Sequence, residues 1–168
     1  MALMITMVWR GTMGAEASTE LPIQPRYTNT RSASVALYND EDNSIVNLKQ
    51  LLPVKSGEKG IRQSDAVFHH TVQLPNLIEE LLKGFNGKIK AIGVSVKPCN
   101  EDGSYMPCFL AGISVARSLA TAMDIPLYSF SHQDGHIAAA LYSANQLNLI
   151  NKDFIEDFHI YRKVCLEI

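Results

Sequence analysis

Two histidines, His132 and His136, stand four residues apart with the carboxylate of Asp134 between them. They follow a short apolar segment that ends at Phe130 and precede an alanine-rich stretch, a pattern typical of a strand that leads into a helix. On a helix, residues i and i+4 lie on the same face, and two imidazoles placed there can bind one metal ion. His132 and His136 are therefore the candidate metal ligands of this chain.

Two histidines alone make an incomplete metal site, because catalytic zinc sites usually have three protein ligands. Asp134 lies two residues from each histidine, so on a continuous helix its carboxylate would lie on roughly the opposite face. It could reach the ion only from a non-helical turn, or it could act indirectly by orienting a ligand. Exposed or capping histidines without a metal remain the alternative. His69 and His70 are adjacent and would point about 100° apart on a helix, so we expect solvated or cap-bonded side chains there.

The composition predicts one soluble globular domain. The 168 residues are 46% apolar and 19% charged, which is enough apolar surface for a sizeable core. The formal charge of −2 gives no overall basic field, so contact with RNA would need a local patch or a partner protein. Cys99, Cys108 and Cys165 are too widely spaced for a disulfide framework. No segment reaches the roughly 20 apolar residues of a membrane span, so we expect no membrane partner and a cytoplasmic protein.

The apolar patterns predict an α/β fold. A hairpin is expected around the polar turn 39–44, followed by alternating helices and strands, which together favour a mixed sheet. Pro75 is expected to kink or divide the first helix, which Ser64 or Asp65 would cap and Gly84 would end. The expected strands cover residues 34–38, 45–52, 89–96 and 125–130, with a further candidate at 2–9, and the expected helices cover 64–83, 108–123 and 135–145.

Three stretches of the chain carry a family resemblance. They are Leu51–Lys55 with Gly60–Phe68, Gly103–Gly112, and Asp124–Leu127 with the motif His132–His136. Together they resemble the N-terminal lobe of the tRNA threonylcarbamoyladenosine synthase family, formerly described as O-sialoglycoprotein endopeptidase or glycoprotease. The first two stretches are similar to a Firmicutes-type branch, and the third is similar to the whole family.

The resemblance implies an RNase H-like or actin-like lobe of the sugar kinase–Hsp70–actin type. This lobe would have a mixed sheet of about five strands with helices on both faces, and it would cover residues 27–155. Residues 1–26 would be a divergent or poorly ordered N-terminus, and 156–168 a divergent C-terminal end, with the second lobe absent from a truncated chain. Tyr27, Thr28 and Asn29 stand where the family has an Asp-Thr-Ser phosphate-loop motif.

The resemblance also implies a metal-dependent transferase that attaches a threonylcarbamoyl group to N6 of adenosine in tRNA. His132 and His136 would bind iron or zinc, and Asp134 stands where the family usually has Glu. The complete enzyme would use ATP or threonylcarbamoyl-adenylate, with tRNA and the other pathway subunits as partners. A non-catalytic degenerate paralogue that acts as a scaffold or dimerisation subunit, with a homodimer expected, is the alternative. A metallopeptidase is disfavoured because the adjacent Glu of H-E-x-x-H is missing.

Overall fold

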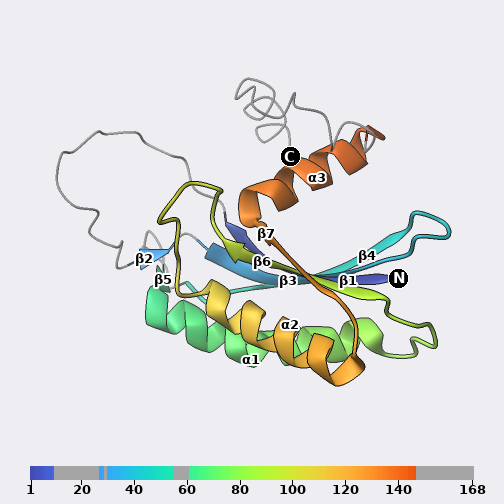
Figure 1. Ribbon diagram of the computed structural model, residues 1–168. Helices are drawn as coiled ribbons and strands as arrows, with labels where there is room; N and C mark the ends of the chain where they lie inside the picture. Colours follow the sequence, from blue (N-terminus) through green and yellow to red (C-terminus); the bar gives the residue numbers. More distant parts are fainter. Residues whose placement is uncertain (10–26, 29, 55–60, 147–168) are drawn as a thin grey trace.

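The computed structural model describes residues 1–9, 27–28, 30–54 and 61–146 (Figure 1). Of the N-terminal segment expected at residues 1–26, only residues 1–9 are described. The C-terminal end expected at residues 156–168 lies outside the described residues.

Among the described residues, five strands form one mixed sheet in the order β4-β3-β1-β6-β7. β1, β3 and β4 are antiparallel neighbours, whereas β6 and β7 run parallel to β1. A separate two-stranded sheet pairs β2 with β5. The expected mixed sheet is confirmed. The strands are β1 (Ala2–Trp9), β2 (Tyr27–Thr28), β3 (Thr30–Tyr38), β4 (Ile45–Leu51), β5 (Ile61–Arg62), β6 (Ala91–Lys97) and β7 (Leu127–Ser131).

The strand candidate at the start of the chain takes the central place in the sheet. β1 pairs with β3 along its whole length, and Ile5 lies opposite Val94 of β6. A central strand needs hydrogen-bonding partners on both sides, and β1 has them. Residues 2–9 therefore lie within the sheet, ahead of the lobe boundary expected at residue 27.

Helices cover both faces of the sheet, as expected (Figure 1). On one face, α1 (Gln63–Leu82) contacts β3 and β4, and α2 (Phe109–Met123) contacts β6 and packs beside α1. On the other face, α3 (His132–Ser143) contacts β1, β6 and β7. Because each parallel strand is followed by a helix, the starts of α2 and α3 come near the carboxyl ends of β6 and β7.

The main core fills the space between the sheet and the pair α1 and α2. Val35 of β3 and Val94 of β6 are fully buried there, since alternate side chains of a strand point to the same face. Small residues of α2, including Ala116 and Ala120, allow this helix to approach the sheet closely. The apolar stripe of α1 that covers the core consists of Leu74, Leu77, Ile78 and Leu81.

The first helix differs from its sequence prediction in two details. α1 continues through Pro75 and is not divided there. Its N-cap is Arg62, which makes no side-chain cap hydrogen bond, so the expected cap at Ser64 or Asp65 is wrong. The expected stop is confirmed: Gly84 adopts φ +74°, a left-handed conformation that glycine accepts at little cost.

Candidate metal centre

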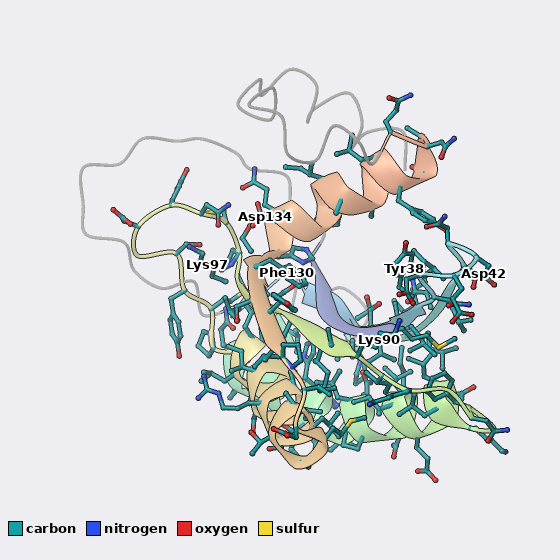
Figure 2. The ribbon with its side chains drawn as sticks, turned by 45° about the vertical axis from the view of Figure 1, so that its right-hand side comes forward. Tyr38, Asp42, Lys90, Lys97, Phe130 and Asp134 are labelled. Carbon is teal, nitrogen blue, oxygen red and sulfur yellow. The ribbon has the colours of Figure 1, made fainter. Side chains whose placement is uncertain are left out.

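The candidate ligands lie where the sheet meets the start of α3. Ser131, the last residue of β7, pairs with Lys97 at the end of β6. α3 begins directly at His132, three residues before the expected start at Gly135, so both histidines belong to its first two turns. Figure 2 shows Asp134 at this end of α3, with Phe130 on the strand that leads into it.

A reciprocal cap explains why the helix begins at His132. The Ser131 hydroxyl oxygen accepts a hydrogen bond from the backbone N–H of Asp134 at 3.1 Å. The Asp134 carboxylate in turn accepts one from the backbone N–H of Ser131 at 3.0 Å. This is a capping box, with an aspartate in the third helical position, and its negative charge also suits the positive end of the helix dipole. The cap thus starts the helix early enough to include His132.

The two imidazoles meet through one nitrogen each. The Nε2 atoms of His132 and His136 are 2.8 Å apart, so one donates a proton to the other, and the rings cross at 76°. His132 is only 5% exposed and lies edge-on to the ring of Phe109 at the start of α2, while His136 is half-buried. Packing of this kind reduces the side-chain freedom that metal binding would otherwise have to remove.

The geometry of the pair fits two positions of a metal site. With metal–nitrogen distances near 2.1 Å, tetrahedral coordination places two ligand nitrogens about 3.4 Å apart. The Nε2 atoms of His132 and His136 would have to separate by about 0.6 Å, which small side-chain rotations supply. Within the described part of the chain, no group of three or more His, Cys, Asp or Glu residues could hold an ion. The described residues therefore offer two candidate ligands, His132 and His136.

Asp134 is held by hydrogen bonds of its own. One carboxylate oxygen is engaged by the Ser131 N–H, and the other accepts from the side-chain amide of Asn100 at 2.9 Å. The helix is continuous from His132, so the non-helical turn that would bring Asp134 toward the ion is absent from this described segment. The carboxylate instead connects the first turn of α3 to the loop after β6.

Two residues of this site, Ser131 and Asn100, are not among the candidates predicted from the sequence. Ser131 could have been recognised, because Ser131 and Asp134 have the Ser-x-x-Asp spacing of a capping box. Asn100 gives no local signal, because it lies 34 residues from Asp134 along the chain. Only the order of the strands brings its loop beside α3.

His70 differs from its prediction, because it is fully buried between α1 and the sheet. Its Nδ1 atom lies 2.6 Å from the carbonyl oxygen of Ala66, to which it donates a proton. Burial lowers the pKa of His70, since the charged imidazolium would lose its hydration. His70 is therefore a buried structural residue of α1.

A charged cluster lies beside the turn between β3 and β4. Asp40 forms ion pairs with Lys90 and with the amino group of Met1. Its hydrogen bonds to Lys90 and to the terminal amine lower the pKa of Asp40 to about 2. Figure 2 shows Lys90, Tyr38 and Asp42 in this region, away from Asp134.

The described helices include none whose length and apolar character would allow it to cross a membrane.

Comparison with known proteins identifies relatives of one kind. The family model described as "TsaD: tRNA N6-adenosine threonylcarbamoyltransferase" matches residues 44–150, which include the histidine pair. A protein of Methanopyrus kandleri named tRNA N6-adenosine threonylcarbamoyltransferase is 28% identical over 76% of this chain and 35% of its own length. A protein of the same name from Campylobacter fetus is 32% identical over 67% of this chain and 32% of its own length. The chain thus spans about a third of these curated relatives.

Solved structures support the fold. The structure titled "YeaZ from Pseudomonas aeruginosa" superposes with a TM-score of 0.52 and 14% sequence identity. The superposition covers 86% of this chain and 49% of that one. This likeness supports the fold described above, a mixed sheet with helices on both faces.

Proposed function

The chain belongs to the tRNA N6-adenosine threonylcarbamoyltransferase family, and we propose that it is the metal-binding lobe of such a transferase, incomplete by itself. The observation that carries this proposal is the convergence of the His132 and His136 Nε2 atoms at the start of α3. The family match covers both residues, and the capped helix presents both rings on one face.

The lobe's own residues would hold the ion and orient its ligands. His132 and His136 would bind the ion through Nε2, so the proton between these two atoms would have to move to an Nδ1 atom or to solvent, because only a ring nitrogen without a proton has a lone pair for a metal. Ser131 and Asp134 keep the helix start in place. A bound iron or zinc ion would supply Lewis-acid polarisation of a carbonyl oxygen. The remaining ligands and the nucleotide contacts would come from residues beyond the described part of the chain.

The substrates follow from family membership and complete the proposal. The whole transferase would pass a threonylcarbamoyl group from threonylcarbamoyl-adenylate, made with ATP, to N6 of adenosine in tRNA. Its partners would be tRNA and the other subunits of this modification pathway, and its location the cytoplasm. The Firmicutes-type branch also remains part of the proposal.

Metal content tests the proposal directly. We would measure iron and zinc in the purified chain by elemental mass spectrometry, beside the double variant His132→Ala, His136→Ala. A matched control, His69→Ala, removes an imidazole from α1 and leaves the pair intact. We expect metal in the wild type and in the control, and its loss in the double variant. Equal metal in all three proteins would contradict the assignment of these ligands.

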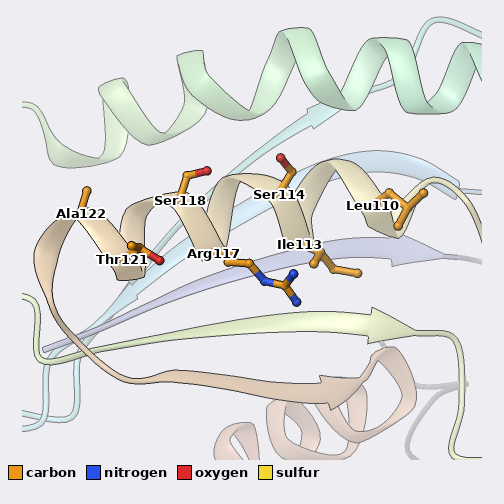
Figure 3. A pocket seen from close by; sticks show the side chains of 7 residues that line it. All are labelled: Leu110, Ile113, Ser114, Arg117, Ser118, Thr121 and Ala122. Carbon is orange, nitrogen blue, oxygen red and sulfur yellow. The ribbon is translucent and has the colours of Figure 1, made fainter.

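A second function, as a dimerisation or scaffold subunit, is favoured by apolar side chains on the outer helical layer. Phe68 and Val72 of α1 are 63% and 48% exposed, and they lie one turn apart on one face. Leu110 of α2 is exposed as well and lies at one end of a groove of about 660 Å³ along this helix. Figure 3 shows that Arg117 and several hydroxyl side chains line the same groove. Large apolar residues that stay exposed on an outer helical layer are a feature of interaction surfaces.

Light scattering at several protein concentrations tests this second function. We expect a homodimer that the substitution Phe68→Ser converts to a monomer, while Met123→Ser, at the far end of α2, leaves the dimer intact. A monomer at all concentrations would remove the dimerisation function for the isolated chain. Asp134, the carboxylate between the histidines, accepts hydrogen bonds from Ser131 and Asn100, which favours a structural role for it over that of the general base of a peptidase.

A further inference from the structure

The loop after β6 is attached to the first turn of α3 at two points. The side-chain amide of Asn100 donates a hydrogen bond to Asp134 at 2.9 Å. The backbone N–H of Gln133 donates to the carbonyl oxygen of Pro98 at 3.1 Å. Asp134 and Gln133 both lie between the two candidate ligands in the sequence. A shift of this loop would therefore move the turn that carries His132 and His136.

We infer that Asn100 is a positioning residue for the histidine pair, acting through Asp134. This inference rests on the proposed metal-binding function. The Asp134 carboxylate has one oxygen on the Ser131 N–H and the other on Asn100, so its orientation is fixed from both sides. A hydrogen bond to a charged acceptor is stronger than one between neutral groups. Asn100 is exposed and lies on a loop, so its substitution disturbs no core packing.

Electrostatics and positioning predict opposite results for one substitution. Asn100→Asp places a second carboxylate against Asp134, which removes the donor and adds repulsion. If only charge mattered, the extra negative charge would attract a metal cation more strongly. If Asn100 positions the first turn, the same substitution weakens metal binding because the two Nε2 atoms no longer converge.

A second substitution restores the bond without restoring the original residues. In the double variant Asn100→Asp, Asp134→Asn, the new amide at position 134 can donate to the carboxylate at position 100. Its oxygen can still accept from the Ser131 N–H. The double variant has the same net charge as the wild type, so a recovery of affinity reports the hydrogen bond itself.

The experiment measures Zn²⁺ affinity of the full chain by competition with a chromophoric chelator. We expect Asn100→Asp to weaken binding about tenfold, at the low end of the range for lost partners of ligand residues. The double variant should return to within about twofold of the wild type. Asp102 is an exposed neighbour in the same loop, and the control Asp102→Asn should keep the Zn²⁺ affinity within about twofold of the wild type. Circular dichroism must show that each variant is folded.

The ring nitrogens provide a readout that does not depend on metal. Long-range ¹H–¹⁵N spectra of the metal-free chain report the bond between the Nε2 atoms of His132 and His136. If the wild type binds no Zn²⁺, the proposed metal function fails, but these signals still decide the positioning role. A shift in Asn100→Asp that is reversed in the double variant supports it. Two results in Asn100→Asp overturn the positioning role. One is unchanged ring-nitrogen signals, and the other is Zn²⁺ binding that is as tight as in the wild type or tighter.

Discussion

The cap at Ser131 allows the most direct test of how the proposed metal centre is built. Ser131 is fully buried, and its hydroxyl accepts the backbone N–H of Asp134 at 3.1 Å. Replacing an N-cap serine by alanine costs about 1 kcal/mol. Because the Asp134 N–H would lose its partner at a site with little access to water, we expect a cost of about 1–2 kcal/mol for Ser131→Ala. In a chain of this length this lowers Tm by about 2–8 °C.

Urea unfolding followed by circular dichroism measures this cost. Ser131→Thr keeps a hydroxyl in the cap and should lose less stability than Ser131→Ala. Ser143→Ala is the matched control, because Ser143 lies in the last turn of the same helix and its hydroxyl donates to the carbonyl of Ala140. There we expect a change within about 0.5 kcal/mol, since alanine is the better helix former. If Ser131→Ala costs no more than Ser143→Ala, the capping box does not determine where α3 begins.

Three further predictions concern the rest of the lobe. Burial lowers the pKa of His70, so the unfolded chain binds a proton more readily than the folded chain below about pH 6.5. The free energy of unfolding should therefore fall as the pH decreases through this window, and His70 should contribute at most about 1.4 kcal/mol per pH unit to this fall. The variant His70→Gln should lack this contribution. Urea titrations of both proteins at several pH values test the prediction, which is wrong if the two proteins respond alike. Leu74→Ala, at a fully buried position, should cost about 2–5 kcal/mol in the same assay, and a smaller loss would mean that the core collapses around the cavity. Asp124→Gly should raise stability by about 0.5–1 kcal/mol in thermal unfolding, because Asp124 has φ +51° at the end of α2, and a decrease would show that its side chain stabilises this turn.

The elements of the fold could be predicted well from local patterns. The apolar spacing of α1 and the β-branched segment of β6 act over neighbouring residues, and the same neighbours decide the local structure. The order of the strands could not be predicted in this way. β1 is the central strand because it pairs with β3 on one side and with β6 on the other, and β6 lies far from β1 in the sequence.

The candidate site shows the same division. The local sequence determined that His132 and His136 lie on one face of a helix, because their spacing matches the helical repeat and the cap formed by Ser131 and Asp134 starts the helix at His132. Tertiary structure decided that His132 packs against Phe109 and that Asn100 meets Asp134. These contacts join segments that are brought together by the parallel pairing of β6 and β7. A local pattern can specify a pair of ligands, whereas long-range pairing decides what orients them.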